Sequence, residues 1–372
     1  MKIGINATIL DDKPTGLGIF TLNIINKLAD GLDEKDEVVI YTSVPSYFKN
    51  LNVTVRKVTD FVQPKNGKKA GLIRFLWTQF IFPILFYRDK CDIIYSTTHH
   101  GNLFLTKKQV LTIHDLLPIK FPNQYRLQNL YFKTIVPHLI KKSPFLFTVS
   151  DNTRKDIVDY YHYGKDKIGV IYNSFDKEHF YHHDEESFKE RFGDYLLFLG
   201  ASYSHKNVER TIKAFLNYKA HSENQINLLI VNRENDYLDS VKNKFRSNKI
   251  FLETVKFVDY VSYNELPILY SNAVALIYTS MYEGFGIPPL EAMACGCPVV
   301  ASNNSSIPEV CGNHALYIDP YDEMSIFQGM KQIVENQDLR KDLSTQGYAQ
   351  TAKFDWAQSA QNLYCDLNKL HL

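Results

Sequence analysis

The sequence has few cysteines and no imbalance of charge, and both features exclude classes of protein. None of its five cysteines forms a C-x-x-C pair or a Cys/His cluster with the spacing of a zinc site. A chain of 372 residues does not need disulfides to hold a core, so reduced thiols are expected. Lys plus Arg total 42 and Asp plus Glu 41, so no overall field attracts nucleic acid. An anionic partner must therefore be held by a local site.

Long apolar runs are also missing. Residues 1–6 lack the apolar core of a signal peptide. No run of eighteen apolar residues occurs, so we expect no segment that spans a bilayer. These absences predict a soluble or peripheral protein of the cytoplasm.

What the sequence does contain is an alternation of strands and helices, beginning in its first half. A Pro/Gly loop at 11–18 precedes a helix at 19–29. Strands are predicted at 3–10, 38–42, 93–96, 110–113 and 145–149. Strands that are buried on both faces and alternate with helices indicate a parallel sheet.

The same alternation restarts after a charged, His-rich stretch at 176–191, which is predicted to be a linker. Strands are then expected at 195–199, 226–231, 250–257, 274–278, 298–301 and 315–318. Helices are expected between them, notably at 208–218, 264–270 and 288–294. The length also exceeds one ordinary core. The sequence therefore predicts an α/β protein with two doubly wound domains, residues 1–175 and 192–355, whose ligands bind beyond the strands' carboxyl ends.

The most informative segment is E-G-F-G-I-P-P-L-E-A at 283–292, which follows a predicted strand and opens a helix. Pro288 and Pro289 suit the first helical turn. Glycines let backbone N–H groups approach a ligand, and a helix N-terminus attracts anions. Glu283 and Glu291 can then hold the two ends of an extended ligand whose phosphates lie between them. A plain strand-to-helix turn is the alternative interpretation.

This segment resembles the E-x7-E signature of retaining GT-B glycosyltransferases, especially glycosyltransferase family 4. The motif continues as M-A-C-G-C-P-V-V, and segments 305–310 and 315–320 follow in the order that the family shows. The resemblance runs almost from end to end and includes the closing helix at 356–372. It implies a GT-B fold, with two Rossmann-like domains facing a central cleft and the last helix packed back on the first domain.

The resemblance also implies roles for the motif residues. Glu283 would contact hydroxyls of the transferred sugar, and Glu291 would hold the nucleotide ribose. The backbone N–H groups of the intervening loop would bind the diphosphate; its residues are Phe285, Gly286 and Ile287.

Segment 200–207 resembles the family's strand end that finishes in Arg-Lys-Asn. Lys206 matches the lysine that neutralises the leaving diphosphate. His205 stands where the family has arginine, so the second positive charge would come from a protonated His205 or from Arg210. A solvated lysine beside a helix start is the ordinary alternative for Lys206.

Three further positions match the family's motifs in order. Gly16 and Gly18 resemble the glycine loop after the first strand, which faces the donor phosphates and the acceptor; a plain turn is the alternative. His114 matches a histidine near the sugar and its anomeric centre, although a structural His-Asp pair would look the same. Val261 lies in a segment whose backbone borders the nucleobase.

Residues 65–87 combine a basic flank, formed by Lys65, Lys68, Lys69 and Arg74, with bulky apolar residues. This combination favours peripheral contact with an anionic membrane. The segment is too short, and too interrupted by Pro83, to span a bilayer. An ordinary core helix after a charged loop explains the same residues equally well.

Together these features predict a retaining hexosyltransferase that needs no metal and no cofactor. Its donor would be a nucleotide-diphosphate sugar, with mannose as a mild preference, and its acceptor a saccharide or a polyprenyl-linked saccharide in surface polysaccharide or glycolipid synthesis. Its place would be the cytoplasm, at the inner face of the plasma membrane if 65–87 binds lipid. The alternatives are a nucleotide-sugar 2-epimerase and a catalytically silent nucleotide-sugar-binding protein.

Overall fold

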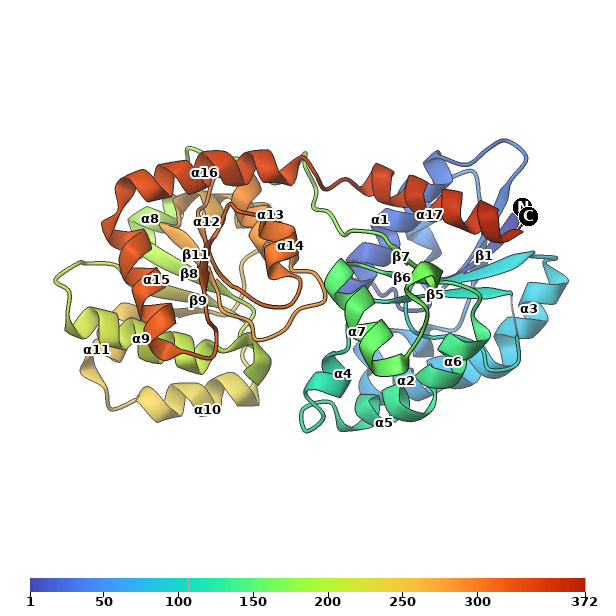
Figure 1. Ribbon diagram of the computed structural model, residues 1–372, viewed down its shortest axis with the longest axis horizontal. Helices are drawn as coiled ribbons and strands as arrows, with labels where there is room; N and C mark the ends of the chain where they lie inside the picture. The colour runs from blue at the N-terminus through green and yellow to red at the C-terminus, as the bar shows by residue number, and fades with distance from the viewer. Residues whose placement is uncertain (106–107, 372) are drawn as a thin grey trace. The chain divides into compact units, whose positions relative to one another are not determined.

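The computed structural model describes residues 1–105 and 108–371, which form two compact units. Unit 1 consists of Met1–Asn173 and Asp355–Leu372, and unit 2 of Ser174–Phe354. Each unit is built around its own parallel β-sheet, shown in Figure 1.

The sheet of unit 1 has the strand order β3-β2-β1-β4-β5-β6-β7, and its neighbouring strands pair in parallel. Its strands are β1 (Lys2–Asn6), β2 (Glu37–Thr42), β3 (Thr54–Lys57), β4 (Ile93–Ser96), β5 (Gln109–Ile113), β6 (Leu146–Thr148) and β7 (Ile168–Val170). Its helices are α1 (Gly16–Asp30), α2 (Gly67–Leu76), α3 (Phe82–Arg88), α4 (Leu117–Lys120), α5 (Arg126–Thr134), α6 (Val136–Lys142), α7 (Asp151–Tyr161) and α17 (Trp356–His371). Shorter turns are η1 (Pro45–Phe48), η2 (Asp60–Val62), η3 (Pro64–Asn66), η4 (Trp77–Ile81) and η5 (Lys165–Lys167).

The sheet of unit 2 has the order β10-β9-β8-β11-β12-β13, again parallel. Its strands are β8 (Tyr195–Leu199), β9 (Asn227–Val231), β10 (Val255–Val258), β11 (Ala275–Tyr278), β12 (Val299–Ser302) and β13 (Leu316–Ile318). Its helices are α8 (Ser187–Phe192), α9 (Val208–Ala220), α10 (Asp236–Phe245), α11 (Lys249–Thr254), α12 (Leu266–Asn272), α13 (Ile287–Ala294), α14 (Ile307–Cys311), α15 (Glu323–Glu335) and α16 (Gln337–Thr351). Two short turns are η6 (Ser204–Lys206) and η7 (Tyr263–Glu265).

The predicted fold class, two doubly wound Rossmann-like units, is confirmed. The chain reverses its direction of winding once in each sheet, between β1 and β4 in unit 1 and between β8 and β11 in unit 2. At such a switch point the loops leaving the two central strands diverge to opposite faces, which opens a crevice at the sheet edge. These two edges are where site residues are to be sought.

Three local predictions were wrong. Residues 250–254 are helical, because Asn248 caps α11 by accepting a hydrogen bond from the Phe251 N–H, and only Val255–Val258 form a strand. Helix α1 begins at Gly16 rather than Ile19. The first strand ends at Asn6, because the Asn6 side chain turns the chain by accepting hydrogen bonds from Thr8.

The ends of the two units are tied down by side chains. Helix α17 packs against α1, with Leu363 and Leu367 fully buried. The segment 176–191 packs on unit 2, with Phe180 and Phe188 buried and the His179 ring stacked on Tyr263 at 3.9 Å. The burial of these aromatic residues could not be predicted from the sequence, because they are spaced irregularly in a polar segment.

Pro83 does not interrupt the helical stretch at 67–88. The Phe82 N–H reaches back five residues to the Trp77 carbonyl, which makes η4 a π-helical turn. Pro83 has no N–H to donate to the Gln79 carbonyl. The Asn102 side-chain amide donates to this carbonyl instead, at 3.0 Å, and also to the Thr78 carbonyl, at 2.6 Å. The helix therefore continues through the proline.

Candidate active site

Lys206 and Glu283 meet at the switch point of unit 2. Lys206 follows β8, and Glu283 follows β11, the neighbouring strand across the reversal. Because parallel strands end at the same edge, residues 77 positions apart in the sequence become neighbours there. The Lys206 Nζ donates to Glu283 Oε1 at 2.7 Å.

The Glu283 carboxylate is buried, with 8% of the residue exposed. Burial by itself raises its pKa, but the charge of Lys206 and the hydrogen bonds from Lys206 and Ser280 outweigh burial, and the pKa of Glu283 is lowered. Tyr278, the last residue of β11, also bonds to Glu283, and its ring lies 5.9 Å from the Lys206 ammonium. The pair is therefore ionised at neutral pH.

The backbone of the motif is fixed by serines from the next loop. The Ser306 hydroxyl donates to the carbonyls of Glu283 and Phe285 at 3.0 and 2.8 Å, and Ser305 Oγ accepts from the Glu283 N–H. Gly286 has φ of 104°, and a Cβ there would lie 2.7 Å from Ile307 Cδ1, so only glycine fits. The loop is held in place before any ligand arrives.

Helix α13 begins directly after Gly286, at Ile287. The first turn of a helix has N–H groups without partners inside the helix, and its dipole favours an anion there. Phe285 is buried, and its ring meets Phe354 edge to face at 5.6 Å. The structure thus places an anion-binding helix tip in the same motif as Glu283.

Glu291 lies on α13, is partly buried, and is hydrogen-bonded to Tyr270 of α12. The Tyr270 hydroxyl donates to Glu291 Oε2 at 2.8 Å. Burial raises the pKa of Glu291 to about 7, against which the Tyr270 hydrogen bond acts. The two glutamates of the motif therefore differ in charge: Glu283 is ionised at neutral pH, whereas Glu291 is only partly ionised.

The surroundings of His205 disfavour a positive charge on its ring. Its side chain is almost fully buried, and burial, followed by the charge of Lys206, lowers its pKa to about 4. Arg210 is occupied by the Asn207 side chain at 2.6 Å and the Pro320 carbonyl at 2.9 Å. Desolvation thus disfavours the protonated His205 that was expected in place of the family's arginine, and the role of His205 stays a prediction.

His114 follows β5 in unit 1. Its Nε2 lies 2.8 Å from the Thr97 carbonyl, which can only accept, so Nε2 carries the proton and Nδ1 is an acceptor. Burial lowers the pKa of His114 to about 4, so the ring is neutral at pH 7. Its ring packs edge to face on Phe20 of α1 at 4.6 Å. This single tautomer can accept a hydrogen bond from a hydroxyl.

Gly16 and Gly18 lie in the first turn of α1 rather than in a loop. A Cβ on Gly18 would meet Pro14 Cβ at 2.8 Å, so the glycine allows a close turn, whereas Gly16 has open space beside it. In unit 2, Val261 is buried and follows the exposed Tyr260, over whose ring Arg233 lies at 5.2 Å. Lys206, Glu283 and the α13 tip are brought together within unit 2, while Gly16, Gly18 and His114 belong to unit 1.

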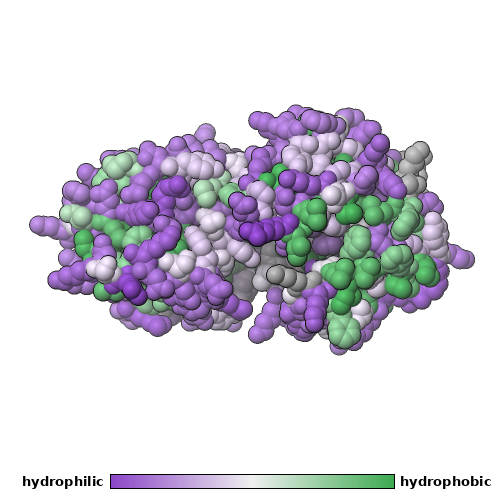
Figure 2. Space-filling view, turned by 90° about the horizontal axis from the view of Figure 1, so that it is seen from below, coloured by the Kyte–Doolittle hydropathy of each residue, from purple (hydrophilic) through white to green (hydrophobic). Residues whose placement is uncertain are grey.

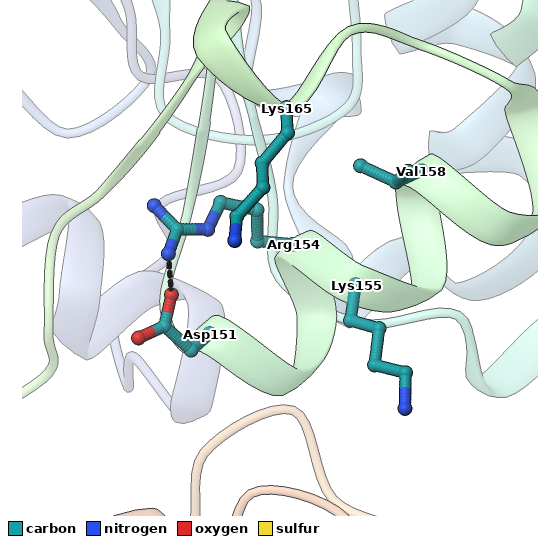
Figure 3. A pocket seen from close by; sticks show the side chains of 5 residues that line it. All are labelled: Asp151, Arg154, Lys155, Val158 and Lys165. Carbon is teal, nitrogen blue, oxygen red and sulfur yellow. Dashed lines mark ion pairs between the residues drawn. The ribbon is translucent and has the colours of Figure 1, made fainter.

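Two surface pockets accompany these residues. One of about 300 Å³ lies beside η6 in unit 2 and is lined by Ser204, Asn207, Glu209, Arg210, Lys213, Tyr237, Met281 and Glu323. The other, of about 320 Å³, lies on α7 in unit 1, where Arg154 pairs with Asp151 beside Lys155 and Lys165 (Figure 3). Within the described part of the chain, no group of three or more His, Cys, Asp or Glu side chains is placed to hold a metal ion.

Tyr270 and Tyr278 are the site residues that sequence reasoning missed. Tyr278 ends the strand before the motif and could have been found from that position. Tyr270 lies 21 residues before its partner Glu291, on a separate helix, so no local sequence pattern predicts their contact.

Comparisons with known proteins agree with these arrangements. A family model described as glycosyl transferases group 1 matches residues 182–350, and one described as glycosyltransferase family 4 matches residues 14–179. The chain is 32% identical to the O-antigen chain mannosyltransferase RfbU of Salmonella typhimurium over 331 residues, covering 88% of this chain and 90% of the relative. It is 26% identical to the O-antigen chain mannosyltransferase B of Escherichia coli, covering 92% and 93%.

Among solved structures, Anabaena Alr3699/HepE in complex with UDP and glucose is similar in fold. The TM-score is 0.75 at 18% identity, covering 99% of this chain and all of that one. The lipopolysaccharide outer core galactosyltransferase WaaB gives a TM-score of 0.65 at 15% identity, covering 98% and 99%.

The Lys206–Glu283 pair makes a prediction about stability. Replacing Glu283 with Gln leaves a part-buried ammonium without its counter-charge, and we expect a loss of about 3 kcal/mol at pH 7. The lowered pKa means that the stabilisation is complete above the ordinary carboxyl pKa of about 4.3 and disappears as the pH falls through the lower folded value. Urea unfolding at several pH values measures this.

The matched control is Glu253→Gln, which removes an exposed pair with Lys249 on α11 and should change stability by less than about 0.5 kcal/mol. A difference between wild type and Glu283→Gln that persists unchanged below pH 3 would show that the charge is not responsible.

Proposed function

The chain belongs to the glycosyl transferases group 1 family and is a glycosyltransferase, and we propose that it transfers mannose, with retention, from a nucleotide-diphosphate donor to a saccharide or polyprenyl-linked saccharide in surface polysaccharide synthesis. The observation that carries this proposal is the Lys206–Glu283 pair beside the tip of α13. This arrangement combines the Lys206 cation, a helix N-terminus that can bind an anion, and the Glu283 carboxylate, which can accept hydrogen bonds from sugar hydroxyls. The mannosyltransferase names of the two relatives support mannose as the sugar.

In the proposed reaction, the acceptor hydroxyl attacks the anomeric carbon on the side from which the nucleoside diphosphate leaves. A phosphate oxygen takes the acceptor proton, and the bond from the anomeric carbon to the diphosphate oxygen breaks. Lys206 and the N–H groups at the start of α13 stabilise the leaving diphosphate. This chemistry needs no metal and no cofactor.

Glu283 orients the sugar in this proposal, because its ionised carboxylate accepts hydrogen bonds from sugar hydroxyls. In unit 1, the neutral His114 can accept a hydrogen bond from a hydroxyl through Nδ1. Lys206 exchanges part of its bond to Glu283 for the diphosphate when the donor binds. The ion pair therefore holds both groups ready before binding, which reduces the reorganisation needed during transfer.

The experiment that tests the proposal is transfer from GDP-mannose and UDP-glucose, with the anomeric configuration of the product determined by NMR. We expect Lys206→Ala to lower kcat by about 100-fold or more, because a charge-assisted contact to the leaving group is lost. Lys213→Ala, an exposed lysine of α9 paired with Glu209, is the matched control. Equal rates in Lys206→Ala and wild type, or an inverted product, would contradict the proposal.

Glu291 is proposed to hold the ribose, and this makes donor binding depend on pH. With a pKa of about 7, the ionised fraction rises about tenfold from pH 6 to pH 8, so Kd for the nucleoside diphosphate should fall by up to that factor. The neighbours Tyr270, Tyr263 and Cys295 have raised pKa values and stay protonated over this range. Calorimetry with GDP and UDP measures the trend.

Glu291→Gln should bind more weakly at pH 8 and show a flat profile. A wild-type profile that is flat between pH 6 and 8 would remove Glu291 from this role.

We also propose that unit 1 contacts the inner face of the plasma membrane. The helical stretch Lys69–Arg88 is long and apolar enough to be a candidate membrane span by length and composition, although core helices share these properties. Trp77, Phe82 and Phe86 face the core of unit 1. The opposite side exposes an apolar stripe at about four-residue spacing, Leu72, Leu76, Phe80, Ile84 and Tyr87. Figure 2 shows apolar side chains gathered on this part of unit 1.

The basic flank is smaller than the sequence suggested. Arg74 is buried, Lys65 pairs with Asp12, and the side chain of Lys68 lies outside the described residues. The apolar stripe rather than the charge therefore supports lipid contact.

Liposome flotation tests this surface. Wild type should float with vesicles that contain anionic phospholipid, and the double variant Phe80→Asp, Ile84→Asp should bind at least about tenfold more weakly. Tyr348→Asp, an equally exposed aromatic on α16 of unit 2, is the control. Failure of the wild type to float would leave the stripe as an ordinary surface.

A further inference from the structure

Arg74 is a buried cation with two donor nitrogens that have no hydrogen-bond partner among the described residues. It lies on α2 with 8% of its surface exposed, and its Nε and Nη1 atoms donate to no atom of the described residues. A guanidinium remains charged in proteins, and burying one without acceptors costs several kcal/mol. Such a group persists where a ligand supplies the missing acceptors.

The surroundings of Arg74 contain little negative charge. Burial lowers its pKa to about 10, so it is protonated at neutral pH, and the carboxylate that opposes this shift is Asp11, in the loop after β1. His99 and His100 lie in the loop after β4. Burial is the main cause that lowers their pKa values, and the charge of the nearby Arg74 lowers them further. Both imidazoles are neutral, so Arg74 is the cation of this cluster and its two unpartnered N–H groups are free to bind an anion.

A second buried donor lies beside the same histidines. The Tyr131 hydroxyl has no hydrogen-bond partner among the described residues, and its ring lies 5.8 Å from His99 and 6.3 Å from His100. Burial raises the pKa of Tyr131, so the hydroxyl keeps its proton and can donate. Arg74 of α2 and Tyr131 of α5, both with unpartnered donors, thus lie near the same two histidine rings.

The position in the fold also points to a ligand. Asp11 follows β1 and His99 follows β4, the two strands at the switch point of unit 1. The equivalent edge of unit 2 holds Lys206 and Glu283. The β4–β5 loop is pinned to the helix by Asn102 and by Gln79, which binds the Gly101 carbonyl and the Leu103 N–H. The site is therefore rigid without a ligand.

Apolar surface adjoins this site. Leu127 and Leu130 are exposed on α5, the helix that carries Tyr131. A ligand with an anionic group and a hydrocarbon chain suits both features.

We propose that Arg74 and Tyr131 bind the phosphate of a lipid-linked acceptor, whose hydrocarbon chain lies along the exposed leucines of α5. This deepens the proposed function and rests on it, since the site would select acceptors that carry a lipid phosphate. Arg74 binds two phosphate oxygens through its fork, and His99 lies close to both Arg74 and His114.

Calorimetry with farnesyl diphosphate, farnesol and inorganic pyrophosphate as probes tests this site. Arg74→Gln should weaken farnesyl diphosphate binding about 10- to 100-fold, the range for charge-assisted bonds, and leave farnesol binding unchanged. Arg74→Lys keeps the charge but loses the fork and should show a smaller loss. If Arg74→Gln fails to fold, Arg74→Lys and Tyr131→Phe decide the question.

Two controls separate this site from others. Arg88→Gln removes an exposed arginine at the far end of the same helical stretch and should bind like wild type. Lys206→Ala should also bind farnesyl diphosphate normally, because its cation serves the donor. Loss of binding in Lys206→Ala with none in Arg74→Gln would overturn the proposal.

If inorganic pyrophosphate binds as tightly as farnesyl diphosphate, and Arg74→Gln weakens its binding, the site binds a free anion. That result would overturn the proposal that the ligand carries a lipid chain. Turnover of nucleotide sugars by the wild type tests the proposed function separately, since farnesyl diphosphate binding does not depend on it.

Discussion

The ion pair between Lys206 and Glu283 depends on a single property of parallel sheets, that neighbouring strands end at the same edge. Strands β8 and β11 are adjacent only because the chain reverses its winding between them. The two residues then face each other across the point where helices diverge, and a distance of 2.7 Å results. The surrounding loop supports this contact: Ser306 fixes the loop, Gly286 permits its turn, and α13 begins directly after Gly286.

Desolvation decides which groups carry charge. His114 and His205 are buried and neutral, whereas Glu283 is ionised beside Lys206 and Arg74 keeps its charge because a guanidinium hardly loses its proton. One basic side chain thus lies near each switch point. Lys206 makes a direct ion pair with Glu283, whereas two guanidinium nitrogens of Arg74 have no hydrogen-bond partner among the described residues.

The helical stretch at 67–88 shows how an apparent flaw in a sequence can be accommodated. Pro83 would ordinarily end a helix, but the π-helical turn before it and the Asn102 amide satisfy the carbonyls that proline leaves open. The extra residue in that turn shifts the helix face, so that Trp77 and Phe82 both reach the core while Phe80 and Ile84 stay outside. The same amide anchors the loop that carries His99 and His100.

The sequence by itself determined the fold class and the motif residues, because alternating buried strands and helices, the turn glycines and the order of the motifs are local properties. It located Glu283, Glu291 and Lys206 without showing that two of them touch. It misjudged Arg74 and residues 250–254, since burial and capping depend on what packs around a side chain. Only the tertiary structure could decide charge and contact, because pKa and distance are set by neighbours that the strand order, not the sequence order, brings together.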